Sequence, residues 1–448
     1  MYVYLLAIIL AINVLTVCLL FNKRHYELTL LFSLFVALHS VQAILMLPQL
    51  VSSSGSILYL YNEVTLEGFE ESLLYLFILS GAALLSGFVL PARSSFSQSP
   101  LFLSSRSDKY RLLFLHLLFV ISLLWFIQSV GGVSAFLYSS RPAAADGSTL
   151  PLVLMSVGIF PLLYLRLLRK KASILSIASY SLSMGVALVT SKMHFLAYLL
   201  STMIVILPAF NPLAGSELRE SLLSITPQLT PSKFIRHFKF SGRLKAFLLS
   251  IVLVLLLFYA GYFRDSLSDL DPTAHTEVTL LGTASDRVNS FSDISVFYNL
   301  AVEGQSSIAG AFTLSRKVNA SSDLGLTILV KSLYQVFPAS LKHNLGSLVD
   351  VNEFYWYQSA IVPSSACDMY IAYGWFGALL FPVFLFGLYR FFLLLYSRSA
   401  SAAFRVSVAV QLGLLVFLVR GSLFVYLAFA IAYLFVSFIP LLVLKARV

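Results

Sequence analysis

Long apolar runs, separated by short polar connections, recur along the whole chain. A run of about 20 apolar residues is the length that an α-helix needs to cross roughly 30 Å of hydrocarbon. Strands of a membrane barrel would instead alternate apolar and polar residues over about ten positions, and these runs do not. The pattern predicts about eleven spanning helices, at residues 2–21, 28–47, 72–90, 112–130, 150–168, 173–190, 193–210, 246–262, 376–396, 402–419 and 422–443.

The composition agrees with this pattern and excludes a water-soluble protein. Of the 448 residues, 59% are hydrophobic and only 11% are charged, and the mean hydropathy is +0.88. Soluble domains have roughly 45–50% apolar and about 25% charged residues. The first run has no basic residue before it and no small-residue cleavage pattern after it, which favours a retained helix over a signal peptide. We expect an all-α integral membrane protein with a single polytopic domain over residues 1–448.

The basic residues predict how the helices are oriented. Of the 30 Lys and Arg residues, 20 fall in alternate connections, at residues 22–27, 91–111, 166–172, 211–245, 397–405 and 444–448. Short cytoplasmic connections carry an excess of basic residues, so the N-terminus is expected outside and the C-terminus in the cytoplasm. Most of the residues behind the net charge of +10 therefore lie in cytoplasmic connections, where they contact anionic lipid headgroups. Nucleic-acid binding is not expected.

The two longest connections differ in character. Residues 211–245, the longest cytoplasmic connection, show no phosphate-loop or metal-ligand spacing. Residues 263–375 form a large outer loop between the eighth and ninth predicted helices, and loops beyond about 15 residues usually have a function. Within it, residues 323–336 and 350–358 have the pattern of amphipathic helices at a membrane interface. We expect a partly helical cap over the outer face.

Several cations are expected at the outer ends of different helices, which makes them candidate binding residues. Ionisable side chains near the membrane mark function unless snorkelling at a helix end explains them. The candidates are Arg141, Lys192, Arg264, Arg287 and Arg420. Arg binds phosphate in a bidentate manner and Lys acts as a point charge. A cationic outer cavity suits a lipid-linked pyrophosphate, because it stabilises the charge that develops on a leaving group.

Acidic and histidine side chains in the large loop are candidates for a general base, which must lie within hydrogen-bond reach of the proton that it removes. The residues are Asp265, Asp269, Asp271, Asp286, Asp293, Glu303, Asp368, His275 and His343. No aspartate-rich motif for a metal is apparent, and Cys18 and Cys367 predict no disulfide framework. We expect no metal and no cofactor.

The order of these features over residues 131–421 resembles the Wzy-type polymerases of O-antigen and capsule repeat units. A short outer loop opens with two glycines and carries Arg141, and Lys192 opens the helix after a span of small residues. The later positions that match the pattern of the family are Pro338, Lys342, Pro363, Ser364, Asp368, Tyr370, Gly374 and Gly377. Two positions depart from it, since Asp368 stands where a Glu is expected and His343 stands where a Pro is commoner.

The resemblance implies an architecture similar to the type C glycosyltransferases, in the bacterial inner membrane. It implies that undecaprenyl-pyrophosphate-linked oligosaccharides are both donor and acceptor at the periplasmic face, with membrane lipids and a polysaccharide chain-length regulator as partners. Arg141, Lys192, Arg264, Arg287, Arg420 and Lys342 would then hold the pyrophosphate, and Asp265, Asp286, Asp368 or His343 would accept the proton.

Two other functions remain open. An O-antigen ligase would transfer the finished glycan to the lipid A core, and His275 and His343 keep this possibility open because a ligase is expected to use a loop histidine. A flippase or other transporter of lipid-linked sugars should place charges near the middle of the membrane, often beside broken helices. Arg390 is the exception to the general absence of charge within the spans, and its position near a helix end suits snorkelling.

Overall fold

A computed structural model of the chain describes ten segments, which are almost entirely helical. They are residues 2–52, 56–59, 62–93, 108–132, 150–168, 170–190, 192–206, 308–313, 364–421 and 423–443. In this part of the chain, six helices are long and apolar enough to cross a membrane: Tyr2–Asn22, Tyr26–Ser52, Leu66–Val89, Tyr110–Ser129, Phe376–Arg398 and Ala402–Arg420. The expected helical membrane protein is therefore confirmed.

The remaining predicted spans coincide with shorter helices or lie outside the described residues. Four shorter apolar helical stretches cover Val153–Leu167, Ile174–Leu188, Met193–Ile206 and Tyr426–Ser437. The predicted span at residues 246–262, the cytoplasmic connection at 211–245 and the two predicted loop helices at 323–336 and 350–358 lie outside the described part. The number of about eleven spans stays a prediction.

The N-terminal elements precede the first long undescribed connection. They are α1 (Tyr2–Asn22), α2 (Tyr26–Val36), a π-helical turn η1 (Ala37–Val41), α3 (Gln42–Ser52), β1 (Ser56–Tyr59), β2 (Asn62–Thr65), α4 (Leu66–Val89) and α5 (Asp108–Ser129). The next group comprises α7 (Leu150–Met155), η3 (Ser156–Ile159), α8 (Phe160–Leu167), α9 (Ile174–Thr190) and α10 (Lys192–Ile206). After one described helical turn at 308–313 come α20 (Ser365–Tyr373), α21 (Phe376–Arg398), α22 (Ala402–Leu414), α23 (Val416–Arg420) and α24 (Leu423–Val443).

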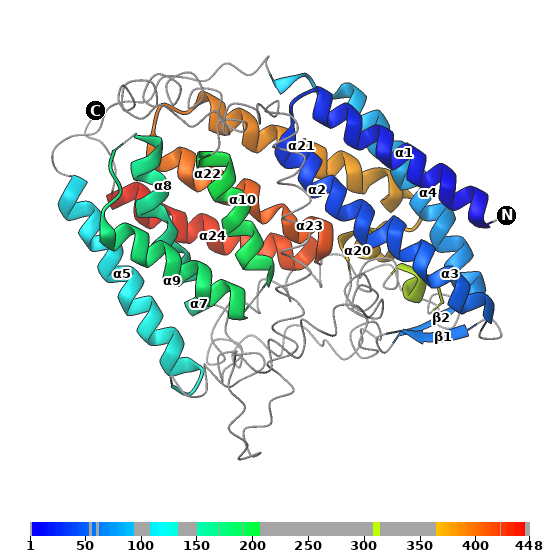
Figure 1. Cartoon of the computed structure of the whole chain (residues 1–448), viewed down its shortest axis with the longest axis horizontal. Helices are drawn as coiled ribbons and strands as arrows, with labels where there is room; N and C mark the ends of the chain where they lie inside the picture. Colours follow the sequence, from blue (N-terminus) through cyan, green and yellow to red (C-terminus); the bar gives the residue numbers. More distant parts are fainter. Residues whose placement is uncertain are drawn as a thin grey trace, which may run out of the picture.

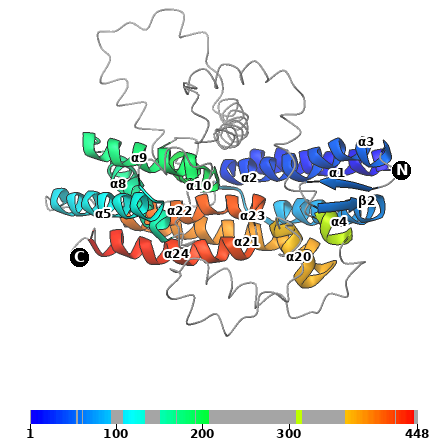
Figure 2. The ribbon, with the colours of Figure 1, turned by 90° about the horizontal axis from the view of Figure 1, so that it is seen from below.

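The helices α22 and α23 form the centre of the bundle. In Figure 1, α1, α2 and α4 lie on one side of them, α5, α8 and α9 lie on the other, and α10 overlaps α22, which it contacts. Figure 2 shows α9, α10, α2 and α1 along one layer and α21 and α24 along another, with α22 between them. The most apolar stretch of Ala402–Arg420 is 94% buried, against 28% for Tyr2–Asn22 and Tyr110–Ser129. The peripheral helices α1 and α5 thus turn apolar side chains toward the position of lipid.

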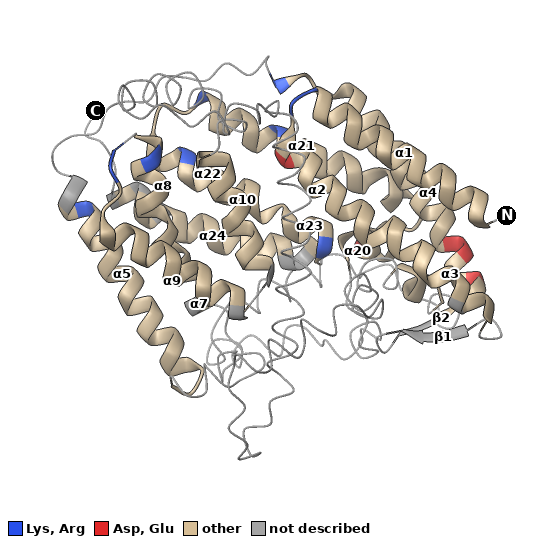
Figure 3. Cartoon of the chain, in the orientation of Figure 1, with Lys and Arg blue, Asp and Glu red and all other residues tan. Residues whose placement is uncertain are grey.

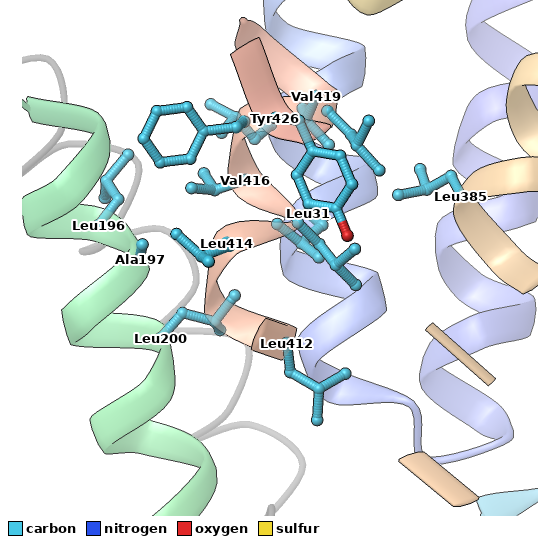
Figure 4. Close-up of a cluster of buried hydrophobic side chains, with 14 of the residues drawn as sticks. Leu31, Leu196, Ala197, Leu200, Leu385, Leu412, Leu414, Val416, Val419 and Tyr426 are labelled. Carbon is cyan, nitrogen blue, oxygen red and sulfur yellow. The ribbon is translucent and has the colours of Figure 1, made fainter. Parts of the chain in front are cut away.

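Close backbone contact at a glycine brings α10 against α22. A Cβ atom on Gly413 would lie 2.2 Å from the carbonyl oxygen of Ala197, so only glycine allows this approach. Around this point, Leu414 and Val416 lie near Leu196, Ala197 and Leu200 of α10, whereas Leu412 points away from α10 (Figure 4). On the other side of α23, Val419 lies between Leu31 of α2 and Leu385 of α21.

Three predicted spans contain irregular turns. The span at 150–168 contains a 3-10 turn at Ser156–Ile159, and the span at 402–419 changes register at Leu415, whose amide bonds to the Leu412 carbonyl at 3.3 Å. In the second span, the π turn Ala37–Val41 lies between α2 and α3. Hydropathy follows the apolar character of side chains and is insensitive to the hydrogen-bond register, so the sequence pattern did not predict these turns.

The two ends of the bundle differ in charge. Figure 3 shows Lys and Arg gathered along one edge, where α8 and α21 end, while acidic residues lie at the opposite end of α4. We call the first the basic end; it carries Lys23, Arg24, Arg93, Lys170 and Arg398. We call the second the loop end, because the helical turn at 308–313 and α20, both parts of the predicted large loop, lie there. The expected charge asymmetry is present, and the orientation of the ends in the membrane stays a prediction.

A β-hairpin at the loop end replaces most of the connection that the sequence analysis left between the second and third spans. Strands β1 and β2 pair antiparallel, with Ser56 opposite Thr65 and Tyr59 opposite Asn62. The third span begins at Leu66, six residues before the predicted start, because the Thr65 hydroxyl accepts a hydrogen bond from the Gly68 amide at 3.1 Å. Such a side-chain cap satisfies an amide that has no partner within the helix.

At the basic end, a buried carboxylate and guanidinium form an ion pair. Glu27 and Arg93, which are 1% and 8% exposed, meet through Oε2 and Nη1. The Tyr389 hydroxyl donates to the same carboxylate oxygen at 3.2 Å, and His25 Nδ1 lies 3.1 Å from that hydroxyl. His25 Nε2 lies 2.7 Å from the Pro91 carbonyl oxygen. Burial lowers the pKa of His25. These contacts tie α2, α4 and α21 together.

Candidate functional site at the loop end

Helix α20, at the end of the predicted large loop, forms one wall of the candidate site. Its first turn is capped by the hydroxyl of Ser364, which accepts a hydrogen bond from the Cys367 amide at 3.2 Å. The helix ends at Gly374, whose φ of +57° lies in the region that favours glycine. The segment with the family-like pattern, from Ser364 to Gly377, is therefore a short capped helix followed by a tight turn.

Asp368 joins α20 to the start of α24. Its side chain is only 2% exposed, and Oδ2 accepts a hydrogen bond from the Leu423 amide at 2.7 Å. A carboxylate is favourable at a helix N-terminus, where backbone amides point outward and the helix dipole is positive. Nearby, the Ser365 hydroxyl donates to the Gly421 carbonyl at 2.8 Å. The two hydrogen bonds fix α20 to the corner between α23 and α24.

Arg420 lies at this same corner as the last residue of α23. Its side chain is partly buried, and Nη1 lies 3.5 Å from the sulfur of Met193. Met193 directly follows Lys192, the first residue of α10. Two cations that are 228 positions apart in the sequence therefore belong to helix ends that lie side by side. The start of a helix adds a positive dipole to this surface, which favours an anion.

Aromatic side chains hold the opposite face of α20. The Tyr75 hydroxyl donates to the Ala366 carbonyl at 3.0 Å, and Phe312 stacks on Tyr370 with ring centroids 3.9 Å apart. Trp375 lies 5.4 Å from Phe312, centroid to centroid. Phe312 belongs to the helical turn 308–313, so this part of the predicted large loop packs against α4 and α20. Two pieces of the predicted large loop, 308–313 and α20, are helical in the described structure, and the cap over the outer face stays a prediction.

The turn between α20 and α21 requires glycine at position 377 as well as at position 374. A Cβ atom on Gly377 would lie 2.2 Å from the Met369 carbonyl oxygen, which is closer than real side chains approach. The same added atom would lie 2.8 Å from the Tyr75 hydroxyl oxygen. The Gly-x-x-Gly element thus has a structural role: Gly374 reverses the chain and Gly377 allows α21 to begin against α20.

The structure describes three of the predicted site residues and places them in one region. Asp368 and Arg420 lie at the α20–α23–α24 corner, and the backbone of Lys192 lies at the neighbouring start of α10. Seven others lie outside the described residues: Arg141, Arg264, Arg287, Lys342, Asp265, Asp286 and His343. Their roles stay predictions.

The sequence analysis missed the residues that hold this corner together. Ser365, Met193 and Tyr75 each make a contact between elements that are far apart in the sequence. One local signal was present, since Ser364 stands three residues before Cys367 at the start of an apolar helix, as a capping residue does. No local pattern pointed to Tyr75 or Met193, because their partners lie on other helices.

The chemistry available at this corner is the binding of an anion by a partly buried guanidinium near a helix N-terminus. Arg420 suits bidentate contact with phosphate. Among the residues that the structure describes, no group of three or more His, Cys, Asp or Glu side chains could hold a metal ion. The chain matches no family model, no curated protein and no solved structure.

Proposed function

We propose that this protein is a membrane glycosyltransferase that joins undecaprenyl-pyrophosphate-linked oligosaccharide repeat units into O-antigen or a related surface polysaccharide. One observation carries the proposal: Arg420, the start of α10 at Lys192, and Asp368 meet at the loop end, on three elements that are far apart in the sequence. The family-like positions Ser364, Asp368, Tyr370, Gly374 and Gly377 belong to the same corner. Convergence of cations is what a pyrophosphate leaving group requires.

In the proposed reaction, an acceptor sugar hydroxyl attacks the anomeric carbon of the donor glycan. A new carbon–oxygen bond forms while the bond from the anomeric carbon to the pyrophosphate oxygen breaks, and its electron pair goes to the pyrophosphate. Arg420 and Lys192 stabilise that developing charge, together with the predicted cations Arg141, Arg264, Arg287 and Lys342. The hydroxyl proton passes to a base within hydrogen-bond reach.

Asp368 is a weaker candidate for that base than its place in the sequence pattern suggested. Its Oδ2 accepts the Leu423 amide hydrogen bond, and the side chain is 2% exposed. This contact favours a positioning role for Asp368. By fixing the start of α24, it would also fix the end of α23, where Arg420 lies. The proton acceptor is then among Asp265, Asp286 and His343, and this assignment belongs to the proposal.

A transporter of lipid-linked sugars is the second candidate, and a specific observation favours it. The helices α22 and α23 are discontinuous at Leu415, and a π turn interrupts the second span at Ala37–Val41. Broken helices are common where transporters bind their substrates. The residues Leu414, Leu415 and Val416 at the first break are apolar and buried, however, which suits packing better than recognition of a charged substrate.

Deletion of the gene from its host, followed by gel separation of the surface polysaccharide, tests the proposal. Loss of the long ladder with survival of a band that carries one repeat unit is the expected result for a polymerase. Loss of that band as well would instead indicate ligation or transport, and an unchanged ladder would reject all three functions. Complementation with Arg420→Gln should fail to restore the ladder, whereas Arg398→Gln, which changes an exposed cation at the basic end, should restore it.

A further inference from the structure

A surface groove runs between α4 and α21, away from the candidate site. Its volume is about 680 Å³, and its lining includes Leu85, Val89, Leu379, Val383, Gly387 and Arg390. Leu85, Val89 and Val383 are 68%, 78% and 59% exposed in the described structure. Among the described residues that line the groove, Arg390 is the one that carries a charge, and most of the others are apolar. An apolar groove on the outside of a membrane bundle faces lipid.

Two glycines keep this groove open. A Cβ atom built on Gly81 or on Gly387 would meet no atom within 4 Å. Glycine inside a helix is less stable than alanine, so its presence requires a reason. At Gly413 and Gly377 the reason is a close backbone contact, since an added atom would lie 2.2 Å from a carbonyl oxygen. Among the described residues, Gly81 and Gly387 have no such contact. The absence of a side chain at these two positions instead leaves space in the groove.

The length of the groove matches one leaflet of a bilayer. Its lining extends from Phe77 to Leu90 on α4 and from Leu379 to Arg390 on α21. At 1.5 Å per residue these stretches are about 17–20 Å long, and half of the roughly 30 Å hydrocarbon core is about 15 Å. The groove therefore runs from near the middle of the bundle toward the basic end, and Arg390 is the lining residue of α21 that lies nearest that end.

The charge at the mouth of the groove selects the kind of occupant. Arg390 is exposed, and it makes no hydrogen bond or ion pair with the described residues. A guanidinium in this position suits a phosphate group. The predicted span at 246–262 is a less suitable occupant, because residues 221–262 contain no Asp or Glu and the span is preceded by Arg243 and Lys245. The positive charges of Arg243 and Lys245 would then repel the positive charge of Arg390.

We propose that this groove binds an anionic phospholipid from the leaflet at the basic end. One acyl chain lies along Leu85, Val383 and Gly387, and the headgroup phosphate contacts Arg390. This inference is independent of the proposed polymerase function, because the groove and the loop-end corner share no residue.

Native mass spectrometry of the full-length protein, extracted from bilayers of equal phosphatidylglycerol and phosphatidylcholine content, tests the proposal. The protein should retain phosphatidylglycerol in preference to phosphatidylcholine, and Arg390→Gln should reduce that preference about tenfold, as loss of one charge-assisted contact does. Gly387→Leu should lower the retention of both lipids, because the new side chain enters the groove without meeting other atoms.

Two matched variants serve as controls. Arg398→Gln removes an exposed cation from the same helix outside the groove, and Gly185→Leu adds the same side chain at another glycine with open space around it. Both should retain phosphatidylglycerol as the unmodified protein does. Equal retention of the two lipids by the unmodified protein, or an equal loss in Arg398→Gln, would overturn the proposal. So would photo-crosslinking from position 383 to residues 246–262 in place of lipid.

Discussion

The two ends of the bundle use a buried carboxylate in different ways. At the basic end, Glu27 meets the guanidinium of Arg93 and the hydroxyl of Tyr389, so opposite charges are paired inside the protein. At the loop end, Asp368 accepts a backbone amide hydrogen bond from Leu423, while the partly buried Arg420 lies beside α10. The first arrangement links α2, α4 and α21 through side-chain contacts. The second places a partly buried cation at the corner where the proposed function expects an anion.

The buried ion pair favours a stabilising role for the basic end, and the proposed function assigns recognition to the loop end. Charges paired in the interior contribute mainly when both are present, because removal of one leaves the other desolvated. A cation at the accessible end of a helix contributes little to folding and can act on a substrate. Variants at the two ends should therefore separate the stability of the protein from its activity.

Removal of one partner of the basic-end ion pair should have the largest effect. Glu27→Gln or Arg93→Met leaves a buried charge without its partner and should lower the free energy of unfolding by about 3–5 kcal/mol. The double variant should lose less than either single one. Thermal unfolding of the purified protein measures both effects. Equal midpoints for the single variants and the unmodified protein would show that the pair is not needed for stability.

Substitution of Arg420 should reduce activity with little change in stability. Arg420→Gln should slow polymerisation of lipid-linked repeat units about 10²–10³-fold, the usual effect of removing one donor that stabilises a developing negative charge. Arg420→Lys keeps the charge but loses bidentate geometry, so its activity should lie between the two. Arg398→Gln is the control at the basic end. An Arg420→Gln protein with full activity would remove this residue from the proposed site.

Two substitutions of Asp368 separate a capping role from a catalytic one. Asp368→Ala should lower the free energy of unfolding by about 0.5–2 kcal/mol through loss of the contact with Leu423. Asp368→Asn keeps an oxygen acceptor for that amide and should retain most of the stability and of the activity per folded molecule. If Asp368→Asn instead unfolds normally but loses activity about a hundredfold or more, Asp368 is the base and the capping interpretation is wrong.

The smallest effect should come from the protonation of His25. Burial lowers its pKa below the ordinary value of about 6.5, so the unfolded chain binds the proton more readily than the folded protein. Stability should therefore decline as the pH falls through about 6.5. The charged neighbours are Glu27, Arg93 and Lys23. A plot of unfolding temperature against pH should be flatter for His25→Gln over this range; identical slopes would show that another group controls the decline.

Local patterns predicted much of the fold. Ten of the eleven apolar runs overlap described helices, because the length of an apolar stretch is a local property that a membrane-spanning helix requires. Hydropathy did not locate the helix starts at Thr65 and Ser364, because each start is fixed by one side-chain hydrogen bond. The turns at Ser156–Ile159 and Leu415 depend on backbone register within apolar segments, to which hydropathy is insensitive.

The sequence by itself determined that this is a helical membrane protein, that its basic residues gather at one end, and that Arg420 and Lys192 lie near the other. These are properties of composition and of position along each helix. Only the tertiary structure decided that Arg420 lies beside Met193 and that Asp368 caps α24. The rotation of each helix about its own axis decided these contacts, and that rotation is fixed by packing between distant segments, such as Gly413 against Ala197.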